Sequence, residues 1–246
     1  PLMRLPWLDP RDDNQPFPHP DRALAEPDGL LAAGGNLNPR RLLRAYRLGI
    51  FPWYSSGQPI LWWSPDPRLV LFPERVKLAR SLRKTLRKGL FAATADTEFA
   101  AVMAACAEPR GAMPGTWITP DMHRAYCRLH RLGHAHSIEI WHQGQLAGGL
   151  YGVAAGRVFY GESMFSRISD ASKVALVLLA AQLRRWDFAL IDCQVRTDHL
   201  LSMGAVEIPR TTFLELLQHH CPLPGRDGPW RLDDDLLADL LAPSPP

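Results

Sequence analysis

The chain has 246 residues, of which 46% are hydrophobic and 22% charged, and its formal net charge is +3. The apolar content excludes disorder over the whole chain, and the length suffices for one large domain or two modest ones. With so small a net charge, a nucleic-acid partner would have to meet a local basic patch, because the body of the protein is not globally basic.

The longest apolar stretch, Val174 to Leu183, is too short to cross a membrane. The four cysteines are widely spaced and form no CxxC motif, which disfavours a zinc ribbon or a disulfide framework. We therefore expect a reduced, cytoplasmic protein, and we expect it to be monomeric.

The N-terminal part differs in composition from the rest. Twelve of the 23 prolines and four of the eight tryptophans fall within the first 67 residues. This shift predicts a small, loop-rich N-terminal domain over residues 1–66 and a second domain over residues 67–246. Within the first, a short helix is expected over 38–46, with Asn38 as its N-cap and Gly49 as its stop.

A strongly basic segment follows, over 75–88. Apolar residues recur in it at helical spacing, so a helix with one packed stripe is expected. The alternative is an ordinary solvated face, but seven like charges without one acid repel each other. We interpret the segment as a surface for nucleic-acid phosphates, formed by Arg75, Lys77, Arg80, Arg83, Lys84, Arg87 and Lys88.

The second half alternates between helical and strand patterns. Helices are expected over 120–132 and 171–186, and strands over 137–141, 146–153, 157–164 and 188–195. The three strands in a row indicate an antiparallel meander, and the mixed order favours an α+β domain. From about residue 222 the chain becomes Pro-rich and then acidic, which predicts a tail with at most one short helix.

Three polar side chains stand out at the ends of apolar strands. Asp192 and Gln194 are two residues apart and should share one strand face, with Cys193 on the other. Burying such a pair costs free energy, so it orients either a neighbouring loop or a reacting group. Glu162 ends another apolar strand and could bind a cationic substrate, or it could pair with Arg167.

Motifs for cofactors are missing from the sequence. There is no GxxxxGK[ST], no GxGxxG after a strand and no GxSxG elbow. The histidines near residue 130 lack acidic or cysteine partners at ligand spacing, so structural hydrogen bonds are favoured over a metal site. We expect neither cofactor nor metal. The residues alone thus suggest a transferase that works near a nucleic acid, without naming its reaction.

Several motifs resemble those of the leucyl/phenylalanyl-tRNA–protein transferases of bacteria. The resemblance runs in unbroken order from about Asp28 to Pro209. Its strongest parts are Phe159–Arg167 and Leu190–Val195, and it includes the segments Gly29–Leu37, Gly49–Tyr54, Ile60–Arg68, Gly115–Thr119 and Leu132–Glu139.

The resemblance implies a fold and a reaction. The C-terminal domain would be of the acetyltransferase (GNAT) type, similar to Fem transferases. Leu or Phe, with Met as a further candidate, would pass from its tRNA to the N-terminal amine of proteins that begin with Arg or Lys, which then enter N-end-rule degradation. Asp170 stands where a CoA-dependent acetyltransferase needs a phosphate-cradling glycine, which disfavours CoA chemistry.

The resemblance also implies residue roles. Gln194 would accept a hydrogen bond from the attacking amine, Asp192 would orient Gln194, and Glu162 would hold the acceptor. Substitution of Asp192 or Gln194 by Ala should then cut transfer with little loss of fold. The donor pocket for the terminal adenosine and the apolar side chain would comprise Trp53, Trp117, Leu150, Phe159, Leu179 and Leu183.

The sequence departs from the family pattern within that pocket. Leu150, Leu179 and Leu183 stand where Met or Phe is familiar, so the ranking of Leu, Phe and Met donors could differ here. Outside the pocket, shortly after the strand that carries Asp192 and Gln194, Thr197 replaces an Asn. Two rival functions stay open: a Fem-like transfer to a peptidoglycan precursor, and a tRNA-end binder without activity.

Overall fold

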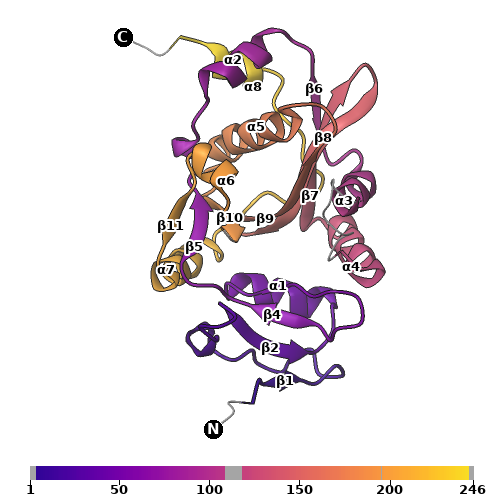
Figure 1. Ribbon diagram of the computed structural model, residues 1–246, viewed down its shortest axis with the longest axis vertical. Helices are drawn as coiled ribbons and strands as arrows, with labels where there is room; N and C mark the ends of the chain where they lie inside the picture. The colour runs from indigo at the N-terminus through magenta and orange to yellow at the C-terminus, as the bar shows by residue number, and fades with distance from the viewer. Residues whose placement is uncertain (1–3, 109–117, 195, 244–246) are drawn as a thin grey trace.

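The computed structural model describes residues 4–108, 118–194 and 196–243. Figure 1 shows a small N-terminal sheet below a much larger one. The small sheet has the strand order β1-β2-β4-β3, with β1 parallel to β2 and the other pairs antiparallel. Its strands are β1 (Trp7–Leu8), β2 (Leu30–Gly34), β3 (Phe51–Pro52) and β4 (Leu61–Trp63), with a 3-10 turn η1 (Pro20–Arg22) after β1.

The helix of the small sheet matches the sequence expectation. Helix α1 (Pro39–Arg47) starts with a proline at its first turn and stops before Gly49, whose φ is +80°. Asn38 is its N-cap residue, but its side chain makes no capping bond and instead donates to Asp13 Oδ2 at 2.9 Å. Tyr46 lies on the buried face of α1, which points toward the large sheet.

The large sheet is mixed. Its strand order is β11-β5-β10-β9-β8-β7-β6, in which β10 is parallel to β9 and every other pair is antiparallel. The expected meander is β7-β8-β9, and the α+β class is confirmed. The strands are β5 (Arg68–Leu71), β6 (Ala92–Ala95), β7 (Ala135–His142), β8 (Gln145–Ala155), β9 (Val158–Ser166), β10 (Leu190–Gln194) and β11 (Val206–Ile208).

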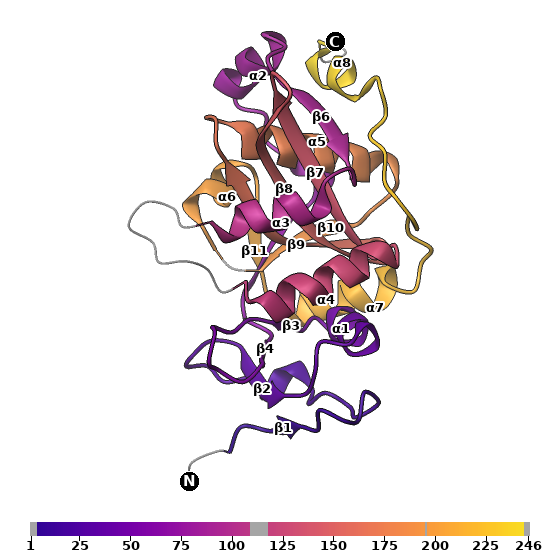
Figure 2. The ribbon, with the colours of Figure 1, turned by 90° about the vertical axis from the view of Figure 1, so that its right-hand side faces the viewer.

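Helices cover both faces of this sheet. Helix α5 (Ala171–Arg185) packs on one face, together with α2 (Arg80–Arg87) and α8 (Leu236–Leu241). Helices α3 (Phe99–Ala107), α4 (Pro120–Arg131) and α7 (Arg210–His220) pack on the other, as Figure 2 shows for α3 and α4. The short α6 (Asp198–Ser202) follows β10. Within the described residues, no helix is long and apolar enough to cross a membrane.

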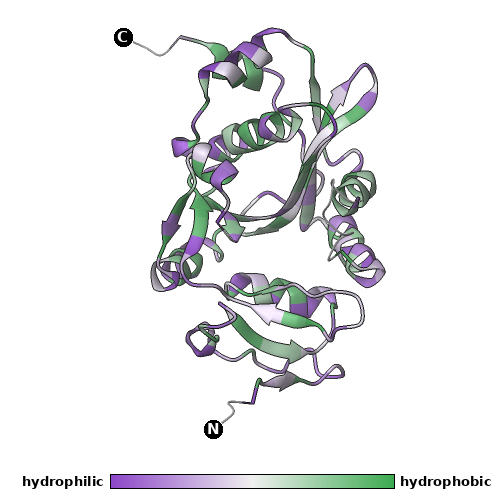
Figure 3. Ribbon diagram, in the orientation of Figure 1, coloured by the Kyte–Doolittle hydropathy of each residue, from purple (hydrophilic) through white to green (hydrophobic). Residues whose placement is uncertain are grey.

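The strand period of two sorts side chains between the faces. Phe159 packs in the cluster under α5, while its neighbour Tyr160 packs in the cluster under α4. In Figure 3 the tip of the β7–β8 hairpin is hydrophilic, whereas the middle of these strands is largely hydrophobic. The two faces of β9 therefore pack into two separate hydrophobic clusters.

The basic helix is shorter than predicted. It begins at Arg80, and the residues before it form a 3-10 turn, η2 (Pro73–Arg75), and an extended stretch. The N–H of Lys77 donates to the carbonyl of Met203 at 2.9 Å, which holds that stretch out of a helix. The predicted boundary near Asp66 falls between β4 and β5, and it stays a prediction.

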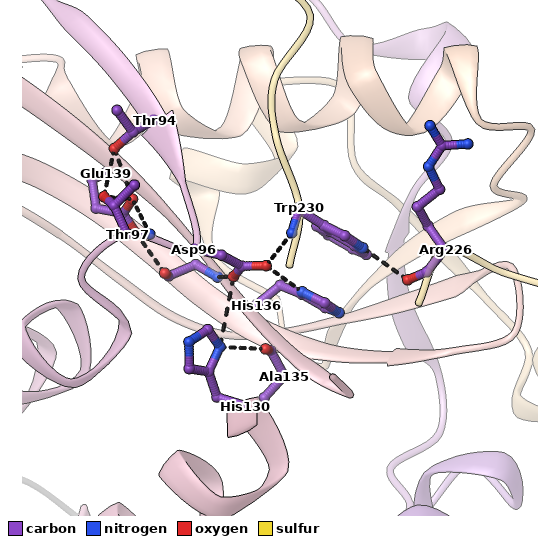
Figure 4. A network of polar contacts seen from close by, with 10 residues as sticks. Thr94, Asp96, Thr97, His130, Ala135, His136, Glu139, Arg226 and Trp230 are labelled. Atoms are coloured by element: carbon purple, nitrogen blue, oxygen red, sulfur yellow. Dashed lines mark hydrogen bonds and ion pairs between the residues drawn. The ribbon is translucent and has the colours of Figure 1, made fainter. Parts of the chain in front are cut away.

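The C-terminal tail crosses the α5 face of the sheet. Arg185 on α5 forms ion pairs with Asp233, Asp235 and Asp239 of the tail at 2.6–3.3 Å. Trp230 is buried, and its ring stacks on His136 with centroids 3.7 Å apart. Figure 4 shows the contact: one Asp96 carboxylate oxygen accepts from the main-chain N–H of Trp230 at 2.6 Å and lies 2.7 Å from the His136 ring nitrogen.

Loss of the Trp230 side chain should loosen this tail. Because the ring fills a buried aromatic cluster, we expect Trp230→Ala to lower the free energy of unfolding by about 3 kcal/mol. Trp7, which is 65% exposed, provides the matched control, and Trp7→Ala should change stability little. Denaturant unfolding of the two variants tests this, and equal effects would contradict it.

Candidate active site

A buried ion pair lies at the centre of the molecule. Arg68 on β5 and Asp192 on the neighbouring strand β10 both have side chains with 0% exposure. The guanidinium donates from Nε to Oδ1 at 3.0 Å and from Nη2 to Oδ2 at 2.8 Å. Its third nitrogen, Nη1, donates to the carbonyl of Gly49 at 2.9 Å, and the group lies 4.4 Å from the ring centre of Phe213. Both charges are thus compensated without water.

Gln194 follows this pair at the end of β10. A bulge interrupts the pairing with β5 between Asp192 and Gln194, and the φ of Gln194 is +66°. The Gln194 N–H donates to Asp192 Oδ1 at 3.0 Å, which stabilises this sparsely populated backbone conformation. Asp192 therefore contacts Gln194 through the main chain, whereas the Gln194 side-chain amide points to Glu162.

Glu162 is the third member of the group. Its Oε1 accepts from the hydroxyl of Tyr46 at 2.5 Å and from Nε2 of Gln194 at 3.4 Å. Arg167 binds Glu108 at 2.9 Å instead, so the alternative pairing of Glu162 with Arg167 is wrong. Burial raises the pKa of Glu162 to about 7, in part opposed by the hydrogen bond from Tyr46.

The other face of the same strands lines a cavity of about 300 Å³. Apolar side chains from β8, β9, β10 and α5 form most of its wall, and among the residues that the structure describes Glu162 is the one acid that lines it. Three of the predicted donor-pocket residues line it: Leu150, Phe159 and Leu179. Cys193 and Thr197 line it too, and burial raises the pKa of the Cys193 thiol, so the thiol stays protonated near neutral pH.

The remaining predicted donor-pocket residues lie elsewhere. Leu183 lies near the C-terminal end of α5, is fully buried in the hydrophobic cluster between α5 and the sheet, and does not line the cavity. Trp53 belongs to the small N-terminal sheet region, is 47% exposed and packs edge-on against Trp63. Trp117 lies outside the described residues.

The basic residues of 75–88 lie on the surface. Arg83 is half-buried and donates to the carbonyl of Leu240, and the other six are exposed. In the part of the chain that the structure describes, none of the seven forms an ion pair with an acidic side chain. Figures 1 and 2 both place α2 above α6, the helix that contributes His199 and Leu200 to the cavity.

Sequence reasoning missed two residues of the site. Arg68 is a charged residue in the apolar run Arg68–Leu71, a signal that could have marked it as paired. Tyr46 gave no signal of its own, because a tyrosine on the apolar side of an amphipathic helix is ordinary core. Its contact with Glu162 joins residues 116 positions apart.

Comparisons with known proteins decide the family. Residues 70–218 match the model of "Leucyl/phenylalanyl-tRNA protein transferase", and residues 35–66 match the model of that family's N-terminal domain. The chain belongs to the leucyl/phenylalanyl-tRNA protein transferase family. It is therefore an aminoacyltransferase, as the sequence motifs indicated.

Relatives extend the match over nearly the whole chain. The leucyl/phenylalanyl-tRNA–protein transferase of Aromatoleum aromaticum is 61% identical over 90% of this chain and 94% of its own length. That of Nitrosomonas europaea is 58% identical over 89% and 92%. Among solved structures, a GCN5-related N-acetyltransferase from Kribbella flavida matches with a TM-score of 0.35 and 12% identity, over 66% of this chain and 58% of its own. The α+β assignment itself rests on the sheet topology.

The buried ion pair changes the expectation for Asp192. Asp192→Asn leaves the Arg68 charge buried without a partner, so we expect a loss of about 3–5 kcal/mol in unfolding free energy together with the loss of transfer. Gln194→Ala removes a half-buried amide and should reduce transfer with a stability change below about 1 kcal/mol. Denaturant unfolding and transfer rates, measured on both variants, test this contrast.

A paired substitution separates structure from chemistry. Arg68→Met combined with Asp192→Leu replaces the ion pair by apolar side chains, so it should recover much of the stability. It also removes the acceptor for the Gln194 N–H, so transfer should stay low. An Asp192→Asn variant as stable as the parent protein would contradict the account of the pair.

Proposed function

We propose that this protein transfers Leu or Phe from aminoacyl-tRNA to the N-terminal α-amine of proteins that begin with Arg or Lys, which marks them for N-end-rule degradation. The observation that carries the proposal is the placement of a single carboxylate, Glu162, where an apolar cavity meets a polar strand end. Family membership supports the reaction class. Because aminoacyl-tRNA is a cytoplasmic pool, we also place the reaction in the cytoplasm.

The cavity suits the donor side chain. Its wall is apolar, and a volume of about 300 Å³ has room for a Leu or Phe side chain. Leu150, Phe159 and Leu179 would contact that side chain directly. Leu183 would support them from the core, while Trp53 and Trp117 stay predicted contacts of the terminal adenosine. Apolar walls discriminate weakly, so Met remains a third candidate donor.

Glu162 suits the acceptor. One of its oxygens is held by Tyr46 and Gln194, and no hydrogen bond from residues 4–108, 118–194 or 196–243 reaches the other, Oε2. A charged hydrogen bond from an N-terminal Arg or Lys to Oε2 would fix the substrate and discriminate against acidic N-termini. The binding of a cation would also favour the ionised form of a carboxyl whose pKa is about 7.

The chemical step is an aminolysis. The amine nitrogen forms a bond to the ester carbonyl carbon, the bond from that carbon to the ribose oxygen breaks, and the proton of the amine passes to the departing ribose oxygen. Since an α-amine has a pKa of about 7.7–8.0, a useful fraction is neutral near pH 7.5. Gln194 would accept a hydrogen bond from the amine through its amide oxygen, and the ribose 2′-hydroxyl would relay the proton. Holding the two reactants together contributes much of the rate.

The basic surface of 75–88 suits the tRNA backbone. Its exposed cations have no acidic partners in the described part of the chain, so phosphates can neutralise them without breaking ion pairs. Phosphate contacts position a nucleic acid without reading its sequence. Such a surface would present the acceptor end to the cavity from the side of α2.

Removal of three cations from this surface should weaken tRNA binding. For Arg80→Ala, Lys84→Ala and Arg87→Ala combined, we expect the slope of log affinity against log salt to fall by roughly 0.7–0.9 for each lost phosphate contact. The matched control is the removal of the exposed Arg4, Arg11 and Arg22 of the N-terminal region. Equal slopes in the two triple variants would contradict the assignment of the surface.

A transfer assay tests the proposed function. tRNA charged separately with labelled Leu, Phe, Met or Arg is offered to peptides that begin with Lys, Arg or Asp. We expect label from Leu-tRNA and Phe-tRNA on the Lys and Arg peptides only. Label on the Asp peptide alone would overturn the role of Glu162, and bound tRNA with no transfer would favour the inactive binder.

A further inference from the structure

We propose that Tyr46 and Tyr126 are positioning residues for the acceptor site: their hydroxyls form a buried chain that holds one oxygen of Glu162 and turns the other toward the substrate. The inference rests on the proposed function, because it assigns a task to groups behind the acceptor carboxylate. It adds residues from α1 and α4 to a site otherwise built from the large sheet.

The direction of the hydrogen bonds follows from proton counting. The Tyr46 hydroxyl lies 2.5 Å from Glu162 Oε1, and the Tyr126 hydroxyl lies within hydrogen-bond distance of the Tyr46 hydroxyl. An ionised carboxylate can only accept, so the single proton of Tyr46 goes to Glu162. Tyr126 must then donate to Tyr46. The hydrogen bond from Tyr126 polarises the Tyr46 hydroxyl and so strengthens the hydrogen bond that Tyr46 donates to the carboxylate, where the chain ends.

Both rings are fixed in place. Tyr46 and Tyr126 have 0% exposure. The hydroxyl of Tyr160 donates to the main-chain carbonyl of Tyr46, and the two rings lie 4.9 Å apart. Tyr126 packs edge-on against Tyr151. A phenylalanine would fill either position equally well, so the packing alone does not account for two buried hydroxyls, whose burial costs free energy unless they are bonded.

The hydroxyls stay protonated across the working range. Burial raises the pKa of Tyr46 and of Tyr126 well above the usual value, and the charge of Glu162 adds to the effect. They therefore act as donors at neutral pH and favour the ionised form of the carboxyl. This opposes the burial that raises the pKa of Glu162.

The other groups that face Glu162 cannot replace this effect. Asp192 raises the pKa of Glu162 and Arg68 lowers it, but these two are paired with each other. Gln194 donates only a long bond of 3.4 Å. Burial keeps the Tyr151 hydroxyl on β8 protonated, and the same holds for the Cys193 thiol in the cavity. His199 also lines the cavity, and burial lowers its pKa, so it is mostly neutral near pH 7.

The test compares three tyrosines changed to phenylalanine. For an Arg-peptide acceptor, kcat/KM should fall as the pH drops through about 7, because protonated Glu162 cannot pair with the cation. Tyr46→Phe removes the donor that favours ionisation, so this acidic limb of the pH profile should move up by about one pH unit, which is roughly a fivefold loss at pH 7 and about tenfold well below it. Tyr126→Phe should move it less, in the same direction. Since the peptide amine titrates identically in every case, a shift between variants belongs to the enzyme.

Tyr160→Phe is the matched control. Its hydroxyl also binds Tyr46, but at the main chain and not at Glu162. Tyr160→Phe should lower thermal stability and leave unchanged the pH at which kcat/KM falls on the acidic side. If Tyr46→Phe behaves like Tyr160→Phe, with a loss of stability and no shift of the limb, the positioning role is overturned.

A measurement without substrate keeps this inference separate from the proposed function. The pKa of Glu162 is raised in the folded state, so its contribution to stability is lost as the pH rises from about 4.5 to about 7. The unfolding free energy is measured against pH for the parent protein and for Glu162→Gln, and the difference between the two curves locates the upper end of that window. Tyr46→Phe should extend it to higher pH, and an unchanged window would overturn the hydroxyl chain even if transfer occurs. A shifted window with no transfer to basic peptides would instead count against the proposed function alone.

Discussion

The buried pair of Arg68 and Asp192 is the constraint on which the site depends. Two opposite charges without water must satisfy all their hydrogen bonds within the protein, and they do so by linking β5, β10 and the main chain of Gly49. Oδ1 of Asp192, which accepts from Arg68 Nε, also accepts from the N–H of Gln194 and holds that residue in its left-handed conformation. The pair therefore fixes the strand end that carries the site, and it joins the N-terminal region to the large sheet at the same point.

The two faces of the neighbouring parallel strands β9 and β10 carry different side chains. The face toward α5 is apolar and encloses the cavity, whereas on the face toward α1 and α4 the Arg68–Asp192 pair and the tyrosine hydroxyls lie buried among apolar side chains. Glu162 lies just beyond Tyr160, where the pairing of β9 with β10 stops, and its side chain both bonds Tyr46 and lines the cavity. An activated ester with an apolar side chain and a cationic amine need such opposite surroundings within bonding distance of each other. The proposed function places the two substrates at the boundary between these faces.

Local sequence patterns predicted much of the fold but few of the contacts that the site residues make with one another. The meander β7-β8-β9, helices α1, α4 and α5 and strand β10 followed from periodicity and from Pro and Gly signals, and Asp192, Gln194 and Glu162 were found as polar residues in apolar strands. The start of the basic helix was predicted at Arg75, too early in the chain, because a hydrogen bond from the Lys77 N–H to the carbonyl of Met203 holds that stretch extended. The partner of Asp192 lies 124 positions away, and no local pattern encodes such a contact. Residue roles and the domain boundary stay predictions.

A crystal structure with both substrates in place would show whether donor and acceptor meet at Glu162 and Gln194. The complex would contain a non-hydrolysable phenylalanyl-adenosine analogue and a peptide that begins with Arg. We expect the phenyl ring between Leu150, Phe159 and Leu179, the guanidinium or α-amine on Glu162 Oε2, and the amide oxygen of Gln194 on the attacking amine. A peptide cation bound away from Glu162, with the cavity empty of the donor side chain, would contradict it.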